Sequence, residues 1–122
     1  MINSMVVRKP LPNHSDYATA KAALRGLANS LAIELGPYKI RVNSLYMGWM
    51  WGEPVQAYID FEMGQQDISQ EEAVAQVAKS IPLGRIPTDE ECAKAALFLV
   101  SDYASAMTGA SLDVNGGEFM SA

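Results

Sequence analysis

The 122-residue sequence is poor in the residues that build disulfides and metal sites, with one cysteine, Cys92, and one histidine, His14. A single cysteine excludes a disulfide within the chain and any zinc site built from several thiolates, and one histidine adds little to a metal site. Because unpaired cysteines suit a reducing compartment, we expect a cytoplasmic protein without a metal centre.

Basic residues are also scarce, with nine Lys and Arg against fourteen Asp and Glu and a net charge of -5. Nucleic acids and anionic membranes both attract basic surfaces, so this balance predicts neither as a partner. No apolar run approaches the roughly 20 residues that span a bilayer, and no basic and apolar leader follows Met1. We therefore expect small molecules or proteins as partners, with neither secretion nor membrane insertion.

The first part of the chain is typical of a strand followed by a helix. Residues 1–7 (MINSMVV) predict a short buried strand, and residues 11–16 predict a loop that leads into a helix. This helix begins near residues 15–17 and ends at Gly36-Pro37. Its apolar residues recur at helical spacing and predict one buried stripe, formed by Ala20, Leu24, Leu27, Ala28, Leu31 and Leu35.

The rest of the chain continues the alternation of strands and helices. Residues 39–46 predict a second strand, and residues 110–114 a third, followed by a glycine turn. Between them, residues 49–82 are irregular and predict a lid of short helices, one of them opened by a Ser69–Glu72 capping box. Thr88 and Glu91 open a further helix, with a predicted apolar face of Cys92, Ala93, Ala96, Leu97 and Val100. This order predicts an α/β fold with a parallel sheet.

One group of polar side chains has a spacing that suits proton transfer. Tyr17 and Lys21 are four residues apart, so both lie on one face of the predicted helix. A phenol is a poor acid or base at neutral pH, and a nearby ammonium favours its ionised form. Ser4 and Gly48 fall near carboxyl ends of predicted strands, where α/β sheets bind ligands, and a serine hydroxyl there can hydrogen-bond a substrate oxygen. The same spacing also occurs on exposed helices without function.

The sequence around these residues resembles the short-chain dehydrogenases/reductases. Ser4 stands 13 positions before Tyr17, and Tyr17-x-x-x-Lys21 matches the signature of that family. The resemblance extends over residues 17–21 (YATAK), 40–43 (IRVN), 82–85 (PLGR), 96–102 (ALFLVSD) and 108–117 (TGASLDVNGG). It implies the C-terminal part of a Rossmann-like doubly wound parallel sheet, about three strands with flanking helices.

The resemblance also implies an activity and a role for each residue of the group. The reaction is hydride transfer between a nicotinamide cofactor, NAD or NADP, and an alcohol or carbonyl carbon. Tyr17 is then the acid/base, Lys21 favours the phenolate and binds the nicotinamide ribose, and Ser4 orients the substrate carbonyl.

The stretch from Met47 to Gly52 departs from the family pattern. Gly48 and Met50 can still bind the cofactor through backbone groups, but Gly52 stands where the family has a threonine. Trp49 and Trp51 are expected either to contact substrate or to pack the lid onto the core.

A feature of the family is missing from this sequence: no glycine-rich turn follows a strand and opens a helix to hold a pyrophosphate. We therefore expect residues 1–122 to be the C-terminal half of the domain, with Met1 inside an element and the N-terminal half absent. Three parallel strands leave apolar faces uncovered, so we expect the missing half or further copies of the chain as partners. Residues 88–114 would contribute to a homodimer or homotetramer, or serve only as core.

Three functions remain open at this point. The first is an NAD(P)-dependent oxidoreductase that interconverts a secondary alcohol and a ketone, with a hydrophobic substrate because methionines surround the lid. The second is a truncated, non-catalytic fragment that acts only as an assembly module. The third is an unrelated helical interaction protein with a chance signature, which the five matching segments disfavour.

Overall fold

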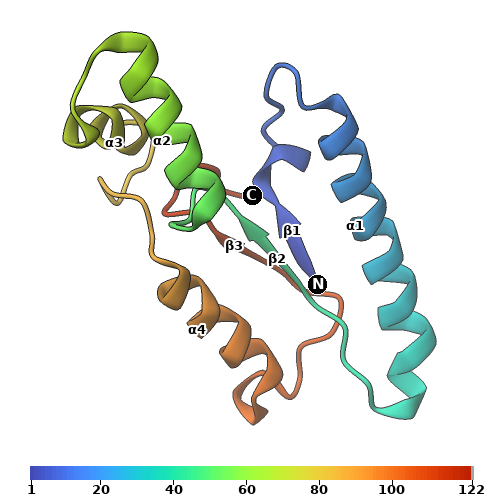
Figure 1. Ribbon diagram of the computed structural model, residues 1–122. Helices are drawn as coiled ribbons and strands as arrows, with labels where there is room; N and C mark the ends of the chain where they lie inside the picture. The colour runs from blue at the N-terminus through green and yellow to red at the C-terminus, as the bar shows by residue number, and fades with distance from the viewer. Residues whose placement is uncertain (122) are drawn as a thin grey trace.

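A three-stranded parallel sheet lies at the centre of the computed structural model, which describes residues 1–121 (Figure 1). Its strands are β1 (Ile2–Ser4), β2 (Ser44–Met47) and β3 (Ser111–Val114), in the order β1-β2-β3. Ser4 pairs with Met47, and Met47 with Val114, so all three strands end at the same edge. The predicted α/β fold with a parallel sheet is confirmed.

Two of the strands are shorter than predicted, and in each case a side-chain hydroxyl accepts a backbone hydrogen bond at the point where the strand stops. Residues 5–7 form a 3-10 helix because the Ser4 hydroxyl accepts a hydrogen bond from the Val6 N–H at 3.3 Å and caps that turn. The predicted strand at residues 39–46 begins only at Ser44. The Val42 N–H donates to the Thr108 hydroxyl at 3.1 Å, so a loop side chain replaces a strand partner there.

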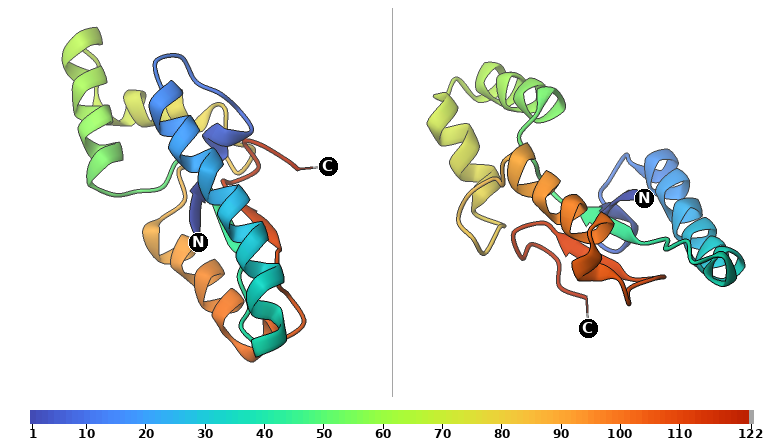
Figure 2. Two further views of the ribbon diagram at one scale, coloured as in Figure 1. Left: turned by 90° about the vertical axis from the view of Figure 1, so that its right-hand side faces the viewer. Right: turned by 90° about the horizontal axis from the view of Figure 1, so that it is seen from below.

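Helix α1 (Ser15–Leu35) connects β1 to β2 and has the predicted bounds, but its stripe is only partly buried. Ala28 and Ala32 are buried, whereas Ala20 and Leu27 are exposed, contrary to the prediction. Helices α1 and α4 lie on opposite sides of the sheet (Figures 1 and 2). The sheet is too narrow for the whole of α1 to find a partner within the described chain.

Helix α4 (Asp89–Val100) packs against the sheet face formed by alternate residues of β2 and β3. Cys92 and Leu99 are buried, and Cys92 is a free thiol. The predicted face was wrong at Ala93, Leu97 and Val100, which are exposed, Leu97 by 64% and Val100 by 75%. The contacts with the sheet instead involve Leu99, Ala95 and Ala96 from α4, with Leu45, Met47, Leu112 and Val114 from the strands.

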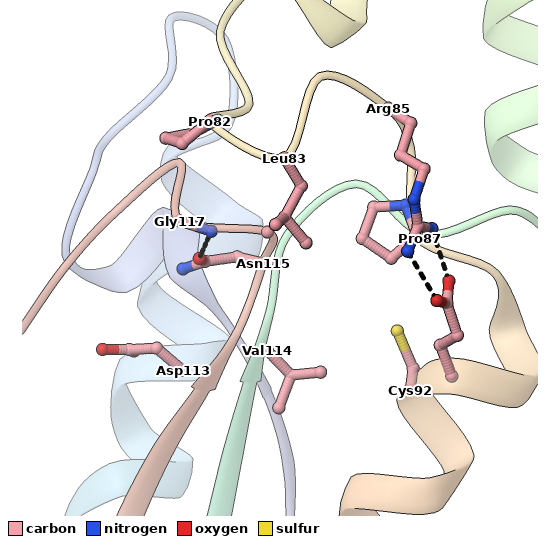
Figure 3. Close-up of a pocket in the computed structure, with 11 residues that line it drawn as sticks. Pro82, Leu83, Arg85, Pro87, Cys92, Asp113, Val114, Asn115 and Gly117 are labelled. Atoms are coloured by element: carbon pink, nitrogen blue, oxygen red, sulfur yellow. Dashed lines mark hydrogen bonds and ion pairs between the residues drawn. The ribbon is translucent and has the colours of Figure 1, made fainter.

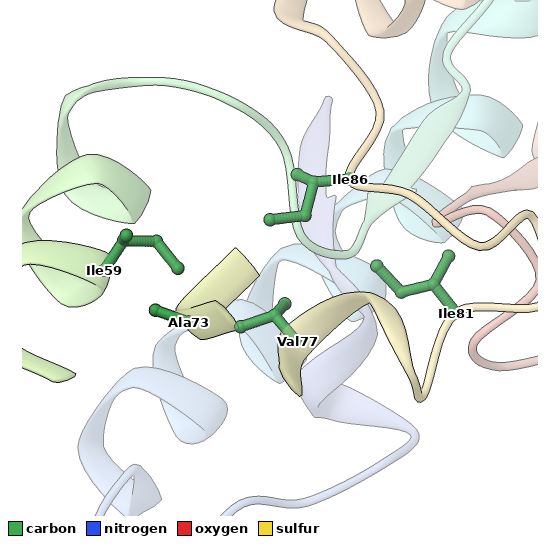
Figure 4. Packing of buried hydrophobic residues seen from close by; sticks show 5 residues of the cluster. All are labelled: Ile59, Ala73, Val77, Ile81 and Ile86. Atoms are coloured by element: carbon green, nitrogen blue, oxygen red, sulfur yellow. The ribbon is translucent and has the colours of Figure 1, made fainter. Parts of the chain in front are cut away.

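The lid consists of helices α2 (Glu53–Gln66) and α3 (Gln70–Ala78) and has a core of its own (Figure 4). Ser69 caps α3 as predicted, because its hydroxyl accepts from the Glu72 N–H at 3.2 Å and the Glu72 carboxylate accepts from the Ser69 N–H at 2.9 Å. The lid core consists of Ile59, Ala73, Val77, Ile81 and Ile86.

Large apolar side chains remain exposed on both flanking helices. Ile33 of α1 is 79% exposed, and Tyr103, just after α4, is 91% exposed. Within residues 1–121, no helix is both long enough and apolar enough to cross a bilayer. The exposed faces favour a covering partner, which stays a prediction.

Candidate active site

The carboxyl edge of the sheet opens into a cavity of about 330 Å³, here called the Tyr17 cavity. Ser4 ends β1, Gly48 directly follows β2, and Tyr17 lies in the first turn of α1, so three separate elements meet there. Tyr17 is 46% exposed, which leaves its phenol accessible to a ligand. The lining residues are Ser4, Met5, Val6, Leu11, His14, Tyr17, Gly48, Trp49, Pro54, Val55 and Tyr58.

Lys21 stands one turn along α1 from Tyr17 but does not line the cavity. Its Nζ donates to the Ile2 carbonyl oxygen at 3.1 Å and lies 5.6 Å from the centroid of the Tyr17 ring. This anchor holds a positive charge beside the phenol. An ammonium has three donor hydrogens, so Lys21 retains donors for a ligand hydroxyl.

Ser4 brings a hydroxyl to the lining of the same cavity. Its oxygen accepts from the Val6 N–H at 3.3 Å, which fixes the oxygen at the start of the 3-10 turn. A serine hydroxyl has one donor hydrogen as well as its acceptor lone pairs. The Ser4 hydrogen therefore remains available to a substrate oxygen.

Gly48 is required by close packing at the floor of the cavity. A Cβ at this position would lie 2.6 Å from the Asn115 Cβ and 3.1 Å from the Met5 Sδ. The Gly48 N–H donates to the Val114 carbonyl oxygen at 3.3 Å. Among the described residues, the backbone hydrogen bonds of the turns and loops include none to the Gly48 carbonyl oxygen. Met50 is half-buried and is not among the residues that line the Tyr17 cavity.

Both tryptophans pack against the lid core, as one of the two predicted alternatives expects. Trp49 also lines the Tyr17 cavity, with its ring 5.1 Å from the Tyr58 ring and tilted by 46°. Trp51 does not line the cavity, and a contact of either tryptophan with substrate stays a prediction. Sequence reasoning missed Tyr58, because nothing in the weakly amphipathic helix α2 distinguishes its position. Burial and the negative charge of Glu62 raise the pKa of Tyr58, which favours its neutral form.

A larger cavity, about 470 Å³, lies beyond the end of β3 (Figure 3). It holds Asn115 and the ion pair between Arg85 and Glu91, joined by two hydrogen bonds of 2.6 Å each. Neither Tyr17 nor Lys21 lines it, and its one arginine already binds a carboxylate. The Tyr17 cavity is therefore the candidate active site.

The Arg85–Glu91 pair leads to a prediction about pH. Hydrogen bonds from Arg85 and then from the Thr88 N–H lower the pKa of Glu91 from 4.5 to about 2. Because the pKa is lower in the folded state, the stabilisation is fully present above pH 4.5 and is lost as the pH falls toward 2. An NMR titration of the Glu91 carboxyl should show a midpoint near 2.

The matched variants for this titration are two arginine substitutions. Arg85→Met should move the Glu91 midpoint upward, because it removes the largest cause of the shift. Arg25→Met changes an arginine on α1 and should leave the midpoint in place. An unchanged midpoint in Arg85→Met would contradict the assigned cause.

The fold places the chain in the Rossmann-like class of α/β proteins, and comparison with known families identifies it further. Residues 1–118 match the family model described as Enoyl-(Acyl carrier protein) reductase. The chain belongs to the short-chain dehydrogenase/reductase family.

Two curated relatives show how much of the family domain the chain covers. Protein FixR of Bradyrhizobium diazoefficiens is 40% identical over 106 residues, which are 87% of this chain and 33% of FixR. The 3-oxoacyl-[acyl-carrier-protein] reductase FabG of Chlamydia trachomatis is 38% identical over 116 residues, 95% of this chain and 42% of FabG. The chain thus spans less than half the length of these relatives.

Solved structures agree in fold. A short chain dehydrogenase family protein from Francisella tularensis superposes with a TM-score of 0.89 at 32% identity, over 96% of this chain and 49% of that protein. An NADPH-bound short chain oxidoreductase from Pseudomonas aeruginosa, described as containing an atypical catalytic center, superposes with a TM-score of 0.84 at 31% identity. The match covers 99% of this chain and 45% of that protein.

Proposed function

We propose that this chain is the C-terminal, catalytic half of an NAD(P)-dependent oxidoreductase that interconverts a secondary alcohol and a ketone. The observation that carries the proposal is the Tyr17 cavity, where Ser4 and Tyr17 face one space and the Lys21 ammonium is fixed 5.6 Å from the Tyr17 ring. A glycine-rich N-terminal segment would complete the domain.

Proton transfer in this site follows from the three side chains. The reduced cofactor, when bound, supplies a hydride to the carbonyl carbon. The Tyr17 hydroxyl gives its proton to the carbonyl oxygen, and the Ser4 hydroxyl donates a hydrogen bond to the same oxygen and orients it. Lys21 stabilises the phenolate left on Tyr17. Overall, ketone, NAD(P)H and one proton give alcohol and NAD(P)⁺.

The residues present suit the nicotinamide end of the cofactor. The spare donors of Lys21 fit ribose hydroxyls, and the Gly48 carbonyl fits a carboxamide N–H. Met50 does not line the Tyr17 cavity, so its backbone contact with the cofactor stays a prediction. Gly52 offers no hydroxyl for a phosphate. Because no glycine-rich turn is present in the sequence, the pyrophosphate depends on the other half, and the proposal covers both NAD and NADP.

The cavity lining favours an uncharged, hydrophobic ketone or alcohol near the reacting carbon. Within the described chain, no Asp, Glu, Lys or Arg lines the Tyr17 cavity. His14 is the one ionisable lining residue besides the two tyrosines, so a charged substrate group there would find no carboxylate, lysine or arginine partner in the lining. Trp49 and Tyr58 supply aromatic surface to the cavity, whereas Trp51 does not line it.

The exposed apolar side chains of α1 and α4 favour a second candidate, an assembly module without catalysis. We infer that the missing half, further copies of this chain, or both cover these faces in a cytoplasmic homo-oligomer. The two candidates share this assembly and differ in whether hydride transfer occurs.

Deuteride transfer tests the proposal. The complete gene product should move deuterium from C4 of a labelled nicotinamide cofactor to the carbinol carbon of 4-phenyl-2-butanol, detected by mass spectrometry. Residues 1–122 alone should give no transfer, because the pyrophosphate site is incomplete. If the complete protein transfers no deuterium to any of a panel of hydrophobic ketones, the assembly module becomes the better reading.

A further inference from the structure

The chain just after Ser4 is a single 3-10 turn, Met5–Val7, here called the Ser4 turn. The Ser4 hydroxyl caps its start, and at its end the Arg8 N–H donates to the Met5 carbonyl oxygen at 2.8 Å. Hydrogen bonds in 3-10 turns have poor geometry, so one such turn depends on contacts outside itself. Met5 and Val6 are buried and line the Tyr17 cavity, so the shape of this turn affects the candidate active site.

Arg8 connects the end of the Ser4 turn to the two other strands. Its guanidinium carbon lies 3.7 Å from the centroid of the Tyr46 ring in β2. Its Nη1 donates to the Asp113 carboxylate in β3 at 2.6 Å. Tyr46 and Asp113 are register partners in the sheet, so the guanidinium rests on two adjacent side chains of one face.

The partners of Arg8 are themselves fixed. Tyr46 is fully buried, and the side chains of Arg8 and Asp113 are 14% and 19% exposed. The Ser121 N–H and hydroxyl donate to the second carboxylate oxygen of Asp113 at 3.1 and 2.5 Å. An ion pair that is shielded from water and held by further hydrogen bonds is stronger than one between mobile surface side chains. Arg8 is therefore a firm anchor for the turn.

Arg8 itself lies outside the Tyr17 cavity. Neither Arg8 nor Asp113 is among the residues that line it, so an effect of Arg8 on the reaction has to pass through the Ser4 turn. In the strand order β1-β2-β3, β1 has no hydrogen-bonded contact with β3. Arg8 supplies a connection between the end of β1 and β3 that the sheet does not provide.

We propose that Arg8 is a positioning residue that holds the Ser4 hydroxyl at the Tyr17 cavity, by fixing the far end of the Ser4 turn on Tyr46 and Asp113. This inference rests on the proposed function, in which the Ser4 hydroxyl donates to the substrate oxygen. Such a donor has to be held within about 0.5 Å of its productive position. Without the guanidinium, the turn keeps its own hydrogen bonds but loses its anchor.

A double-mutant cycle tests whether Arg8 acts through Ser4. Arg8→Met should lower kcat/KM for the ketone in the complete protein about tenfold to a hundredfold, the range for misplacing a group by about 1 Å. Ser4→Ala removes the hydroxyl that Arg8 positions. In the Ser4→Ala background, Arg8→Met should therefore change kcat/KM about twofold at most. Equal losses in the two backgrounds would overturn the proposal, because Arg8 would then act independently of Ser4.

Two further variants separate this effect from a general loss of structure. Asp113→Asn removes the charge of the partner with little change in shape, and it should give the same pattern with a smaller loss. The cycle with Asp113→Asn therefore tests the proposal even if Arg8→Met does not fold. Arg85→Met breaks the ion pair with Glu91, beyond the end of β3, and should keep wild-type kcat/KM. A loss in Arg85→Met as large as that in Arg8→Met would overturn the proposal.

Hydrogen exchange measured by NMR reports on the Ser4 turn without catalysis. The Val6 N–H donates to the Ser4 hydroxyl, so Arg8→Met should speed its exchange severalfold. The Gly109 N–H donates to the Val42 carbonyl oxygen at 2.7 Å near the opposite end of the sheet, and it should exchange at the wild-type rate. Unchanged exchange at Val6, or equal acceleration at both amides, would overturn the role given to Arg8.

Failure here and failure of the proposed function give different results. Faster Val6 exchange in Arg8→Met, in a protein without deuteride transfer, would support the Arg8 anchor and overturn the proposed function. Deuteride transfer with equal losses of kcat/KM in both backgrounds would overturn the role of Arg8 and leave the proposed function standing.

Discussion

Replacing Tyr17 by phenylalanine is expected to reduce kcat for ketone reduction by about 10²–10⁴, the usual contribution of a positioned general acid. The substitution removes one oxygen and keeps the ring, so the cavity wall beside Trp49 and Tyr58 is preserved. The KM for the ketone should change little, because Ser4 still donates to the carbonyl oxygen. Steady-state kinetics of the complete protein measure both values.

The matched control is the same substitution at a tyrosine far from the cavity. Tyr103 follows α4 and is 91% exposed, so Tyr103→Phe should keep wild-type kcat. Ordinary turnover in Tyr17→Phe would remove Tyr17 from the mechanism. A loss confined to KM would instead make Tyr17 a binding residue, since its hydroxyl would then contribute equally to the ground state and the transition state.

The local signals in the sequence predicted most of the fold. Both capping boxes formed as expected, because the Ser69–Glu72 and Thr88–Glu91 spacings involve residues within one turn. The failures came from tertiary context. Leu27 and Leu97 have apolar side chains at helical spacing, but burial also needs a surface to pack against. A sheet of three strands covers only part of each helix.

The ends of the strands also depend on contacts that the local sequence does not predict. Ser4 is compatible with a strand, yet its hydroxyl caps the next turn and ends β1. Val42 has a strand-forming side chain, but its N–H donates to Thr108, which is 66 residues away. Hydrogen bonds of this kind depend on where a distant loop passes, so residue patterns within one segment do not predict them.

The candidate site divides in a similar way. The pair Tyr17 and Lys21 was predictable, because four residues in one helix fix their relative positions. Tyr58 comes from α2 and meets the cavity only through the packing of the lid. Its sequence surroundings carry no motif. This part of the cavity wall is therefore visible only in three dimensions.

Gly116→Ala is expected to destabilise the fold by about 2–5 kcal/mol, the sum of an overpacking cost and a left-handed backbone cost. A Cβ at this position would lie 2.5 Å from the Ile81 Cγ2, and the residue has a φ of +66°. Ile81 is 2% exposed and its β-branched side chain has little freedom to move away. Urea unfolding of the complete protein measures the change in the free energy of unfolding.

Two further variants show whether the glycine is needed for the reasons given. Gly64→Ala lies in α2 with nothing within 4 Å of the new Cβ, so it should stabilise by about 0.5–1 kcal/mol. The double variant Gly116→Ala/Ile81→Ala should lose less free energy of unfolding than the sum of the losses in the two single variants. With Ile81 shortened, the clash is gone, and the Gly116→Ala change adds only its φ strain. Because the Leu83 N–H donates to the Gly116 carbonyl at 3.1 Å, Gly116→Ala should also disturb how the lid meets the end of β3. A Gly116→Ala protein as stable as Gly64→Ala would refute both the clash and the strain.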